Sequence, residues 1–414
     1  MRLYLLLLLI STAATLVLTP VVRRIALGFN VLTPLRERDV HATPIPRLGG
    51  IALTGGITLT ILVGYSIPYF KPVYSASPAL WAVLVGSVAI CLLGAVDDIW
   101  ELDWMTKLAG QFLVAGGMAT AGVQLINIPL FGVTIGSSRL SILISALILV
   151  AIMNAVNFVD GLDGLASGVI AIGSLGFFAY SYILQRLMGE PTYVTGAAIV
   201  TIALAGACMA FLWFNFHPAS IFMGDSGAMV LGLVLGSAAI IVTGQVNPML
   251  LTDDSAAATW MPLIIPMAVL IIPLADLVIT PALRMLHGKS PVTADRTHLH
   301  DRLLVQGHSH RGVVLIMYAW TALVCTVAIL ALILPTNEVL LWALPFLVGT
   351  IIATAYQFPG HRRRKAGVRG TGTPGGKVAI DDGVEVISRA GLGVWYPLMR
   401  SEHEHSQTKN EDKQ

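Results

Sequence analysis

Two adjacent carboxylates, Asp97 and Asp98, end an apolar run of the sequence, and a lysine, Lys107, opens the next one. Adjacent carboxylates repel each other, so at least one of them needs a proton or a cation close by. A Mg²⁺ ion shared with phosphate oxygens would supply that cation, and the lysine could hold a phosphate group. The pattern indicates phosphate chemistry, and its alternative is a solvated loop with ordinary helix-end charges.

A second polar segment, NAVNFVDGLDGLASG, carries amides and carboxylates at every third position: Asn154, Asn157, Asp160 and Asp163. On a helical or 3₁₀ backbone this spacing places neighbouring side chains near one face. The glycines that follow the two aspartates would interrupt the helix and let the backbone approach a ligand. Such a strip suits a metal ion together with a base edge or a sugar. The alternative is a polar turn between two membrane spans.

A third segment, FMGDSG, places Asp225 between glycine and serine at a predicted helix start. Free backbone N–H groups at such a start favour anions, for example a diphosphate. The Asp225 carboxylate could also reach a metal ion bound to that diphosphate. The alternative is that Asp225 or Ser226 only caps the helix.

A basic loop over residues 281–312 contains the string RTHLHDRL, with His298, His300 and Arg302. No cysteine or acidic residue near the two histidines has zinc-like spacing, so phosphate or sugar binding fits this loop better. Asp276 lies close to the predicted inner end of the preceding span. We interpret this acid as a structural partner of the basic loop.

The rest of the sequence is apolar enough to place these polar segments beside a membrane. Hydrophobic residues make up 56% of the 414 residues and charged residues only 12%, against about 25% in soluble domains. Mean hydropathy is +0.79. A membrane-spanning helix needs about 20 mostly apolar residues. We therefore predict an all-α polytopic membrane protein with about eleven spanning helices: 3–22, 48–67, 80–96, 108–122, 140–156, 164–184, 194–214, 228–242, 260–280, 313–334 and 339–357.

Lysine and arginine residues are distributed unequally between the two sets of loops. Three loops of one set and the tail together hold 21 of the 25, which leaves 4 for the other set. The positive-inside rule then places the N-terminus outside and the C-terminus in the cytoplasm. All four polar segments, with His41 and Arg47 of the first inner loop, fall on the cytoplasmic side. The sequence therefore predicts an active-site cleft at the cytoplasmic face of a cell membrane.

Two further segments differ from the apolar body. Residues 123–139 are rich in β-branched side chains around Gly132, which predicts a small β-hairpin on the outer side. Residues 358–414 are glycine-rich, then basic, then acidic, a composition typical of disordered chains. We therefore predict a membrane-embedded domain over residues 1–357 and a disordered cytoplasmic tail over residues 358–414.

The polar segments together resemble the polyprenyl-phosphate N-acetylhexosamine-1-phosphate transferase family. Five strings carry the resemblance: RDVHATPIPRLGG, GAVDDIWELDWMTK, NAVNFVDGLDGLASG, FMGDSG and RTHLHDRL. Their order, spacing and predicted sidedness agree with that family over about residues 20–310. The WecA-like branch looks closest, and MraY, the phospho-MurNAc-pentapeptide translocase, is its sister branch. The resemblance implies transfer of GlcNAc-1-phosphate from UDP-GlcNAc to undecaprenyl or decaprenyl phosphate, with release of UMP.

The same resemblance implies roles for individual residues. Asp97 and Asp98 match the family's catalytic acidic pair, and Lys107 matches its phosphate-contacting lysine. Asp225 and Asn157 match metal ligands, which implies Mg²⁺, with Mn²⁺ as an alternative. The remaining matches are to substrate-binding positions, with Asp163 at the position associated with the uracil edge: Asp160, Asp163, His298, His300, Arg302, His41 and Arg47.

One position departs from the family pattern. Related sequences often continue the His-x-His string with another histidine, whereas this sequence has Asp301, which puts the role of that histidine in question. The His-x-His spacing favours the GlcNAc branch over MraY, although transfer of another UDP-aminosugar stays open. The implied partners are a UDP-aminosugar and a polyprenyl phosphate in the bilayer. A homodimer is compatible with the family, and no nucleic acid is expected.

Alternatives remain for the reaction route and for the class of protein. Direct attack by the lipid phosphate is favoured, because this group is largely dianionic at pH 7 and needs no strong base. A two-step route through an aspartyl intermediate is the competitor. A transporter would need acids at mid-membrane, and a CDP-alcohol phosphotransferase would need a different acidic motif, so both fit less well.

Overall fold

The computed structural model of the chain describes residues 1–33, 44–128, 133–134, 137–187, 189, 192–245, 264, 267–268, 270–286 and 298–356. Contacts group Met1–Arg364 as one unit and Lys365–Gln414 as another. The predicted disordered tail, 358–414, lies outside the described residues. The described elements are almost all helices: α1 (Arg2–Gly28), α2 (Gly49–Ser66), α3 (Lys71–Ala76), α4 (Ala79–Trp100), α5 (Trp104–Thr120), β1 (Asn127–Ile128), β2 (Val133–Thr134), α6 (Ser138–Val159), α7 (Leu165–Leu187), α8 (Thr192–Asn215), α9 (Gly224–Gln245), α11 (Ile271–Leu286), α12 (Leu299–Gln306), α13 (His310–Leu330) and α14 (Thr336–Ala355).

Nine helices within the described ranges are long and apolar enough to cross a membrane: α1, α2, α4, α6, α7, α8, α9, α13 and α14. Each falls on one of the eleven predicted spans. The predicted span 108–122 is α5, whose 17 residues extend about 26 Å, slightly less than a hydrocarbon core of about 30 Å. The predicted span 260–280 ends in α11, and much of its first half lies outside the described residues. The prediction of an all-α polytopic membrane protein is confirmed.

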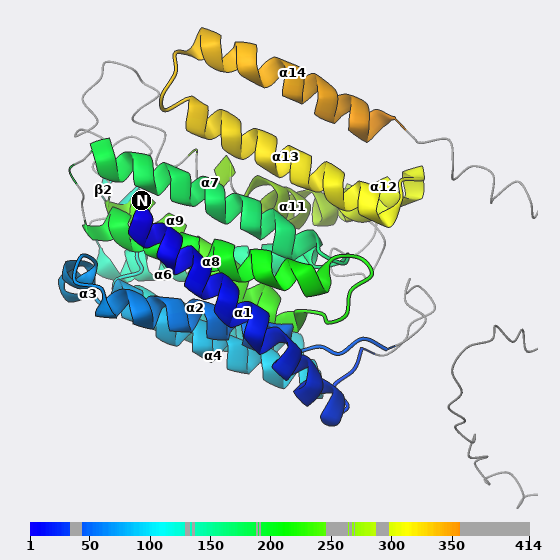
Figure 1. Cartoon of the computed structure of the whole chain (residues 1–414), viewed down its shortest axis with the longest axis horizontal. Coiled ribbons are helices and arrows are strands. Elements are labelled where there is room, and N and C mark those ends of the chain that lie inside the picture. Colours follow the sequence, from blue (N-terminus) through cyan, green and yellow to red (C-terminus); the bar gives the residue numbers. More distant parts are fainter. Residues whose placement is uncertain are drawn as a thin grey trace, which may run out of the picture. The chain divides into compact units, whose positions relative to one another are not determined.

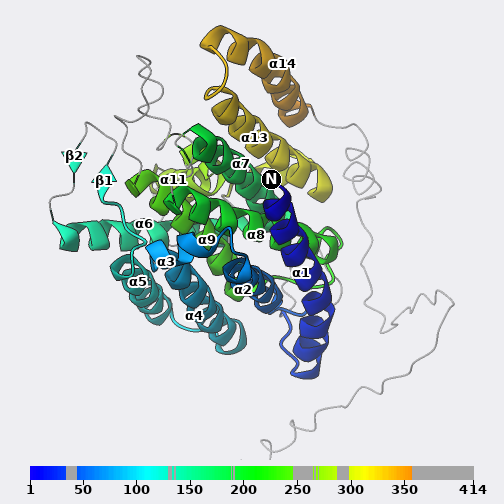
Figure 2. The same ribbon diagram turned by 60° about the vertical axis from the view of Figure 1, so that its left-hand side comes forward.

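The helix α9 lies at the centre of the described bundle. It contacts α2, α4, α6, α7 and α8, and Figure 2 shows these helices around it. Every residue from Ser226 to Gly244 is buried. Its side chains are small or apolar on every side, which is the pattern of a helix without an exposed face. Gly232 allows α6 to approach closely, because a Cβ atom there would lie 2.7 Å from the Cα atom of Met153.

The helices α13 and α14 lie side by side at the periphery of the described unit (Figure 1). Only 11% of the apolar stretch of α14 is buried. Its outward side chains include Leu341 and Trp342, which are 72% and 60% exposed. An apolar face of this kind is suited to contact with lipid rather than with water.

The predicted hairpin is present as a short antiparallel pair. Asn127 pairs with Thr134 and Ile128 pairs with Val133, while Gly132 lies outside the described residues. The strand β1 follows the C-terminal end of α5, and Lys107 lies in the first turn of that helix. The hairpin and the polar segments therefore lie toward opposite ends of α5.

A close-packed seam fixes the N-terminal end of α9 against α2 and α4. The backbone N–H groups of Gly49 and Gly50 donate to the carbonyl oxygens of Phe222 and Met223, at 3.0 and 2.9 Å. On the other side, a Cβ atom at Gly94 of α4 would lie only 2.5 Å from the Cα atom of Ser226. Backbone hydrogen bonds and small residues thus hold the start of α9 in one place.

Candidate active site

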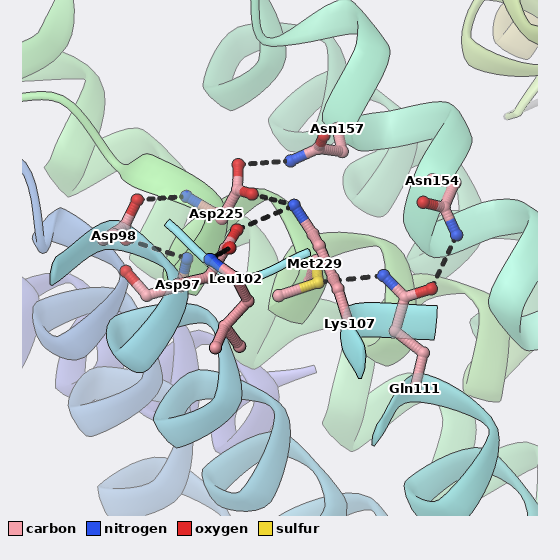
Figure 3. Close-up of polar contacts among 10 residues, drawn as sticks. Asp97, Asp98, Leu102, Lys107, Gln111, Asn154, Asn157, Asp225 and Met229 are labelled. Carbon is pink, nitrogen blue, oxygen red and sulfur yellow. Dashed lines mark hydrogen bonds and ion pairs between the residues drawn. The ribbon is translucent and has the colours of Figure 1, made fainter. Parts of the chain in front are cut away.

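Five polar side chains from four separate helices meet at one end of the bundle: Asp97, Asp98, Lys107, Asn157 and Asp225. We call this group the acid–lysine cluster. The end of α4 supplies the two adjacent aspartates, the start of α5 the lysine, the end of α6 the asparagine and the start of α9 the last aspartate. Figure 3 shows these side chains pointing toward one another. The structure therefore brings together residues that are up to 128 positions apart in sequence.

The carboxylate of Asp98 is held by the first backbone amides of α9. The N–H groups of Asp225 and Ser226 donate to its two oxygens at 2.9 and 3.1 Å (Figure 3). Gly224 makes this possible, since its φ is +69° and a Cβ atom there would lie 2.3 Å from the same carboxylate. The sequence predicted a substrate diphosphate on these amides, but the anion that they bind in this structure is Asp98.

Lys107 links the other two carboxylates of the cluster. Its ammonium lies 2.9 Å from Asp97 and also contacts Asp225. Asp97 accepts a further hydrogen bond from the N–H of Leu102 at 2.9 Å. The lysine is carried on a well-capped helix, because Asp103 accepts hydrogen bonds from the first turn of α5. The hydrogen bonds from Thr106 hold the pKa of Asp103 below its usual range.

The four-residue strip Asn154 to Asp163 does not act as one face. Asn157 donates to Asp225 at 2.8 Å and so joins the acid–lysine cluster. Asn154 instead donates to Gln111 at 2.7 Å, deeper in the bundle. The helix α6 ends at Val159, so the two aspartates fall on the turn that follows. The expectation of a single strip is wrong, because the end of the helix sends its members in different directions.

Asp160 faces this end of the bundle without accepting a hydrogen bond from any residue that the structure describes. Burial, and to a smaller extent the charges of Asp98 and Asp163, raise the pKa of Asp160 to about 7, while Arg47 lowers it. Such a carboxyl exchanges its proton near neutral pH. Asp160 directly follows the last turn of α6, which carries Asn157 of the acid–lysine cluster.

Asp163 is buried and bound by the segment that precedes α9. It pairs with Nδ1 of His217 at 2.7 Å and accepts from the N–H of Ala219 at 3.1 Å. The ring of His310 stacks on that of His217, with centroids 4.3 Å apart. Ligand atoms of these three side chains lie within 4.8 Å of one another and could hold a metal ion. Because Asp163 and Nδ1 of His217 already bind each other at 2.7 Å, we describe these two residues as a carboxylate–histidine pair.

A second carboxylate–histidine pair joins α11 to α12. The carboxylate of Asp276 pairs with Nδ1 of His298 at 2.8 Å. The rings of His298 and His300 are parallel, with centroids 5.6 Å apart. Burial lowers the pKa of His300, so its ring favours the neutral form. The interpretation of Asp276 as a partner of the basic loop agrees with this pair.

Comparisons with known proteins cover most of these elements. A family model described as glycosyl transferase family 4 matches residues 80–243, which contain the whole acid–lysine cluster. A decaprenyl-phosphate N-acetylglucosaminephosphotransferase of Mycolicibacterium smegmatis is 39% identical over 307 residues, which is 73% of this chain and 76% of the relative. This chain belongs to glycosyl transferase family 4.

Other members of family 4 have related names. A probable undecaprenyl-phosphate N-acetylglucosaminyl 1-phosphate transferase of Bacillus subtilis is 30% identical over 312 residues, or 75% of this chain and 79% of the relative. A phospho-N-acetylmuramoyl-pentapeptide-transferase of Moorella thermoacetica is 35% identical over 262 residues, which is 59% of this chain and 77% of the relative. The predicted family is confirmed, and the chain is a multi-pass membrane protein. The two N-acetylglucosamine-type relatives match 73% and 75% of this chain, a larger share than the 59% that the pentapeptide-transferase matches.

The remaining residues singled out from the sequence lie in different places in the structure. Arg47 donates to the hydroxyl of Thr33 at 3.0 Å and influences Asp160 electrostatically. Arg302 lines a small cavity together with Asp276. His41 lies outside the described residues. Asp301 occupies the first turn of α12, where a negative charge favours the helix dipole.

Several residues near the site were not singled out from the sequence. His217 and His310 are 93 positions apart in the chain, and only the fold shows that their rings stack. Gln111 had a usable signal, because a polar amide inside an apolar span is a functional or structural site by default. Here it donates to the sulfur of Met229 and accepts from Asn154, which ties α5 to α6 and α9.

Proposed function

We propose that this chain transfers GlcNAc-1-phosphate from UDP-GlcNAc to a polyprenyl phosphate, releasing UMP. The observation that supports it most is the acid–lysine cluster, in which three carboxylates, one amide and one ammonium meet at a bundle end. The proposed substrates follow from the relatives, whose names describe transfer of N-acetylglucosamine phosphate to a polyprenyl phosphate. A transfer at this point lets a nucleotide sugar come from water while the isoprenoid chain stays in lipid.

The proposed reaction is direct displacement at phosphorus. An oxygen of the lipid phosphate attacks the β-phosphorus of UDP-GlcNAc, the bond from that phosphorus to the bridging oxygen breaks, and UMP leaves with the electron pair. The attacking group is already largely dianionic at pH 7, so positioning and charge neutralisation matter most. Asp97 or Asp98 orients it or takes a residual proton. Lys107 supplies positive charge where phosphoryl charge develops.

A divalent cation fits the same residues. Carboxylate and amide oxygens are the ligands that Mg²⁺ prefers, and Asp225 with Asn157 offers both. The Lys107 ammonium lies between the carboxylates of Asp97 and Asp225 and contacts both. These carboxylates therefore already bind one positive charge together. Asp225 is also the most accessible of these three side chains, at 30% exposed against 10% for Asp97 and 19% for Lys107. When bound, Mg²⁺ would neutralise charge on the diphosphate.

The proposed orientation follows from charge. The basic loops lie on the same side as the polar segments, so we place the acid–lysine cluster at the cytoplasmic face, with the N-terminus outside. The tail over residues 358–414 would then be cytoplasmic. UDP-sugars are made in the cytoplasm, which agrees with that sidedness.

The test uses purified protein in lipid nanodiscs that contain decaprenyl or undecaprenyl phosphate, with Mg²⁺ and a panel of UDP-sugars. We expect UMP release with UDP-GlcNAc, lost on removal of Mg²⁺ with EDTA and lost in Asp225→Asn. Turnover with UDP-MurNAc-pentapeptide alone would assign the chain to the other branch of the family. No UMP from any donor would contradict the transferase proposal. A covalent enzyme adduct trapped during turnover would favour the two-step route.

A further inference from the structure

We propose that Asp276 is a positioning residue for the transfer reaction, because it fixes the orientation and the tautomer of His298. This inference rests on the proposed function. It concerns an acid that lies 20 positions before the start of the RTHLHDRL string and in a different helix. Asp276 reaches that string from α11, across the interval between the two helices.

Three hydrogen bonds converge on the carboxylate of Asp276, which is only 2% exposed. One oxygen accepts from the hydroxyl of Thr280 at 3.0 Å and from the N–H of Leu299 at 2.8 Å. The other oxygen faces Nδ1 of His298 at 2.8 Å. The first oxygen therefore caps the start of α12, and the second is left for the histidine ring.

The pairing decides which ring nitrogen of His298 carries hydrogen. An ionised carboxylate can only accept, so Nδ1 must be the donor. The same contact fixes the plane of the ring, and the other nitrogen, Nε2, is left to interact with a ligand. The side chain of His298 is 21% exposed, in contrast to the 2% of its acidic partner. The histidine thus presents one edge while Asp276 holds the opposite edge.

The held ring is part of a stack of rings that reaches the turn after α6. His298 packs against Phe158 of α6, with ring centroids 5.8 Å apart, and against the parallel ring of His300. His300 lies directly on the turn after α6, because a Cβ atom at Gly161 would be 2.4 Å from its Nε2. That turn begins at Asp160, and the last turn of α6 just before it carries Asn157 of the acid–lysine cluster. A tilt of the His298 ring would therefore displace residues that lie next to the proposed reaction site.

Substitution of Asp276 by Asn separates positioning from capping. An Asn carbonyl oxygen can still accept from Thr280 and Leu299, so the cap of α12 is kept. The NH₂ group then faces Nδ1 of His298 and donates, which forces the opposite tautomer. We expect Asp276→Asn to lower kcat for UDP-GlcNAc about 10- to 100-fold, with a melting temperature close to that of the parent protein.

Two matched variants complete the experiment. Thr280→Val removes a donor to the same carboxylate without touching His298, and we expect its kcat to stay within about threefold of the parent, as for a minor structural contact. His298→Asn keeps an N–H toward Asp276 but has no second ring nitrogen, so we expect it to lose activity as Asp276→Asn does. The double variant Asp276→Asn/His298→Asn should be no worse than either single variant, because both act through one ring.

Two results would overturn the inference while the parent protein turns over UDP-GlcNAc. One is an Asp276→Asn variant within twofold of parent activity. The other is multiplication of the two single losses in the double variant, which means that Asp276 acts independently of His298. If Asp276→Asn does not fold, full activity of His298→Asn overturns the proposal instead. Absence of turnover in the parent protein itself would contradict the proposed function and this inference with it.

Discussion

The acid–lysine cluster and the two carboxylate–histidine pairs hold carboxylates at the same end of the bundle with different kinds of partner. In the first, Asp97 binds an ammonium and Asp98 binds two backbone amides. In the second, Asp163 and Asp276 each bind an imidazole. Lysine stays charged at neutral pH and backbone amides do not titrate, whereas histidine changes charge near neutrality.

This difference separates two tasks within one site. The acid–lysine cluster lies where helix termini converge, and its partners keep a constant charge, as phosphoryl transfer requires of groups that neutralise phosphate. The carboxylate–histidine pairs instead attach neighbouring segments to that frame. One fixes the segment before α9 and the other fixes the start of α12. The comparison predicts that charge loss in the cluster stops the reaction, whereas changes in the pairs modulate it.

The largest effect is expected from Lys107→Met. The substitution leaves Asp97 and Asp225 facing each other without their ammonium, and it removes positive charge from the proposed phosphate position. We expect kcat for UMP release to fall at least about 100-fold. Lys107→Arg should fall less, since it keeps the charge but not the compact geometry.

The matched control for that substitution is Lys71→Met, on the exposed start of the short helix α3. It removes one lysine at the other end of the molecule and should leave kcat unchanged. If Lys107→Met keeps more than a tenth of parent activity, the ammonium is not required for the reaction.

The next effect comes from the seam that supports the cluster. In Gly94→Ala the new Cβ atom would lie 2.5 Å from the backbone of Ser226, so the start of α9 must move away from Asp98. We expect a loss of about 1–3 kcal/mol in stability, as for overpacked cores, and a parallel loss of activity. Thermal unfolding and UMP release measure the two.

Gly116→Ala is the control for this packing argument. Gly116 also lies in a helix, α5, but nothing comes within 4 Å of a Cβ atom built there. The substitution should be neutral or slightly stabilising, because alanine favours helix more than glycine does. Equal losses in the two variants would show that close approach to α9 is not what Gly94 provides.

A smaller effect is expected at the pair Asp163–His217. Asp163→Asn and His217→Ala should each lower the melting temperature, and the double variant should be little worse than either one. Such a cycle gives a coupling free energy of about 1 kcal/mol for residues in direct contact. Additive losses would mean that the 2.7 Å contact contributes nothing to stability.

Much of this architecture could be predicted from the sequence because it depends on local patterns. Apolar runs located nine of the spanning helices, and Gly-Asp-Ser-Gly located the start of α9. Electrostatic repulsion within Asp97–Asp98 predicted a proton or a cation close by, and the Lys107 ammonium lies 2.9 Å from Asp97. The partners themselves follow from tertiary packing, so the amides of α9 were expected to bind substrate and not Asp98.

Other features could not be predicted, because they depend on where a helix ends and what it meets. The short helix α12 was interpreted as part of a loop, although Gly307, with φ at +107°, ends it in a conformation that favours glycine. The contact between Asp163 and His217 joins positions 54 apart, and no periodicity in the sequence encodes it. The roles of the predicted site residues stay predictions until the variants are measured.

The smallest effect concerns Asp160, which is part of neither the acid–lysine cluster nor a carboxylate–histidine pair. Its pKa is raised to about 7 by burial, so the folded protein binds this proton more tightly than the unfolded chain does. Stability from this group is therefore fully present near pH 4 and falls as the pH rises toward 7. Asp160→Asn removes the ionisation, so its melting temperature should exceed that of the parent at pH 8 and match it at pH 4.

We expect the free energies of unfolding of Asp160→Asn and of the parent to differ by about 1 kcal/mol at pH 8. The Asp160 side chain is half-buried, so solvent screens much of the 1.36 kcal/mol that one pKa unit corresponds to. Melting curves in EDTA measure it without a bound metal ion. Asp103→Asn provides the opposite sign, since the lowered pKa of that cap stabilises the protein at neutral pH and is lost in acid. An Asp160→Asn variant less stable than the parent at pH 8 would mean that the carboxylate is held by a partner, which would place Asp160 inside the acid–lysine cluster.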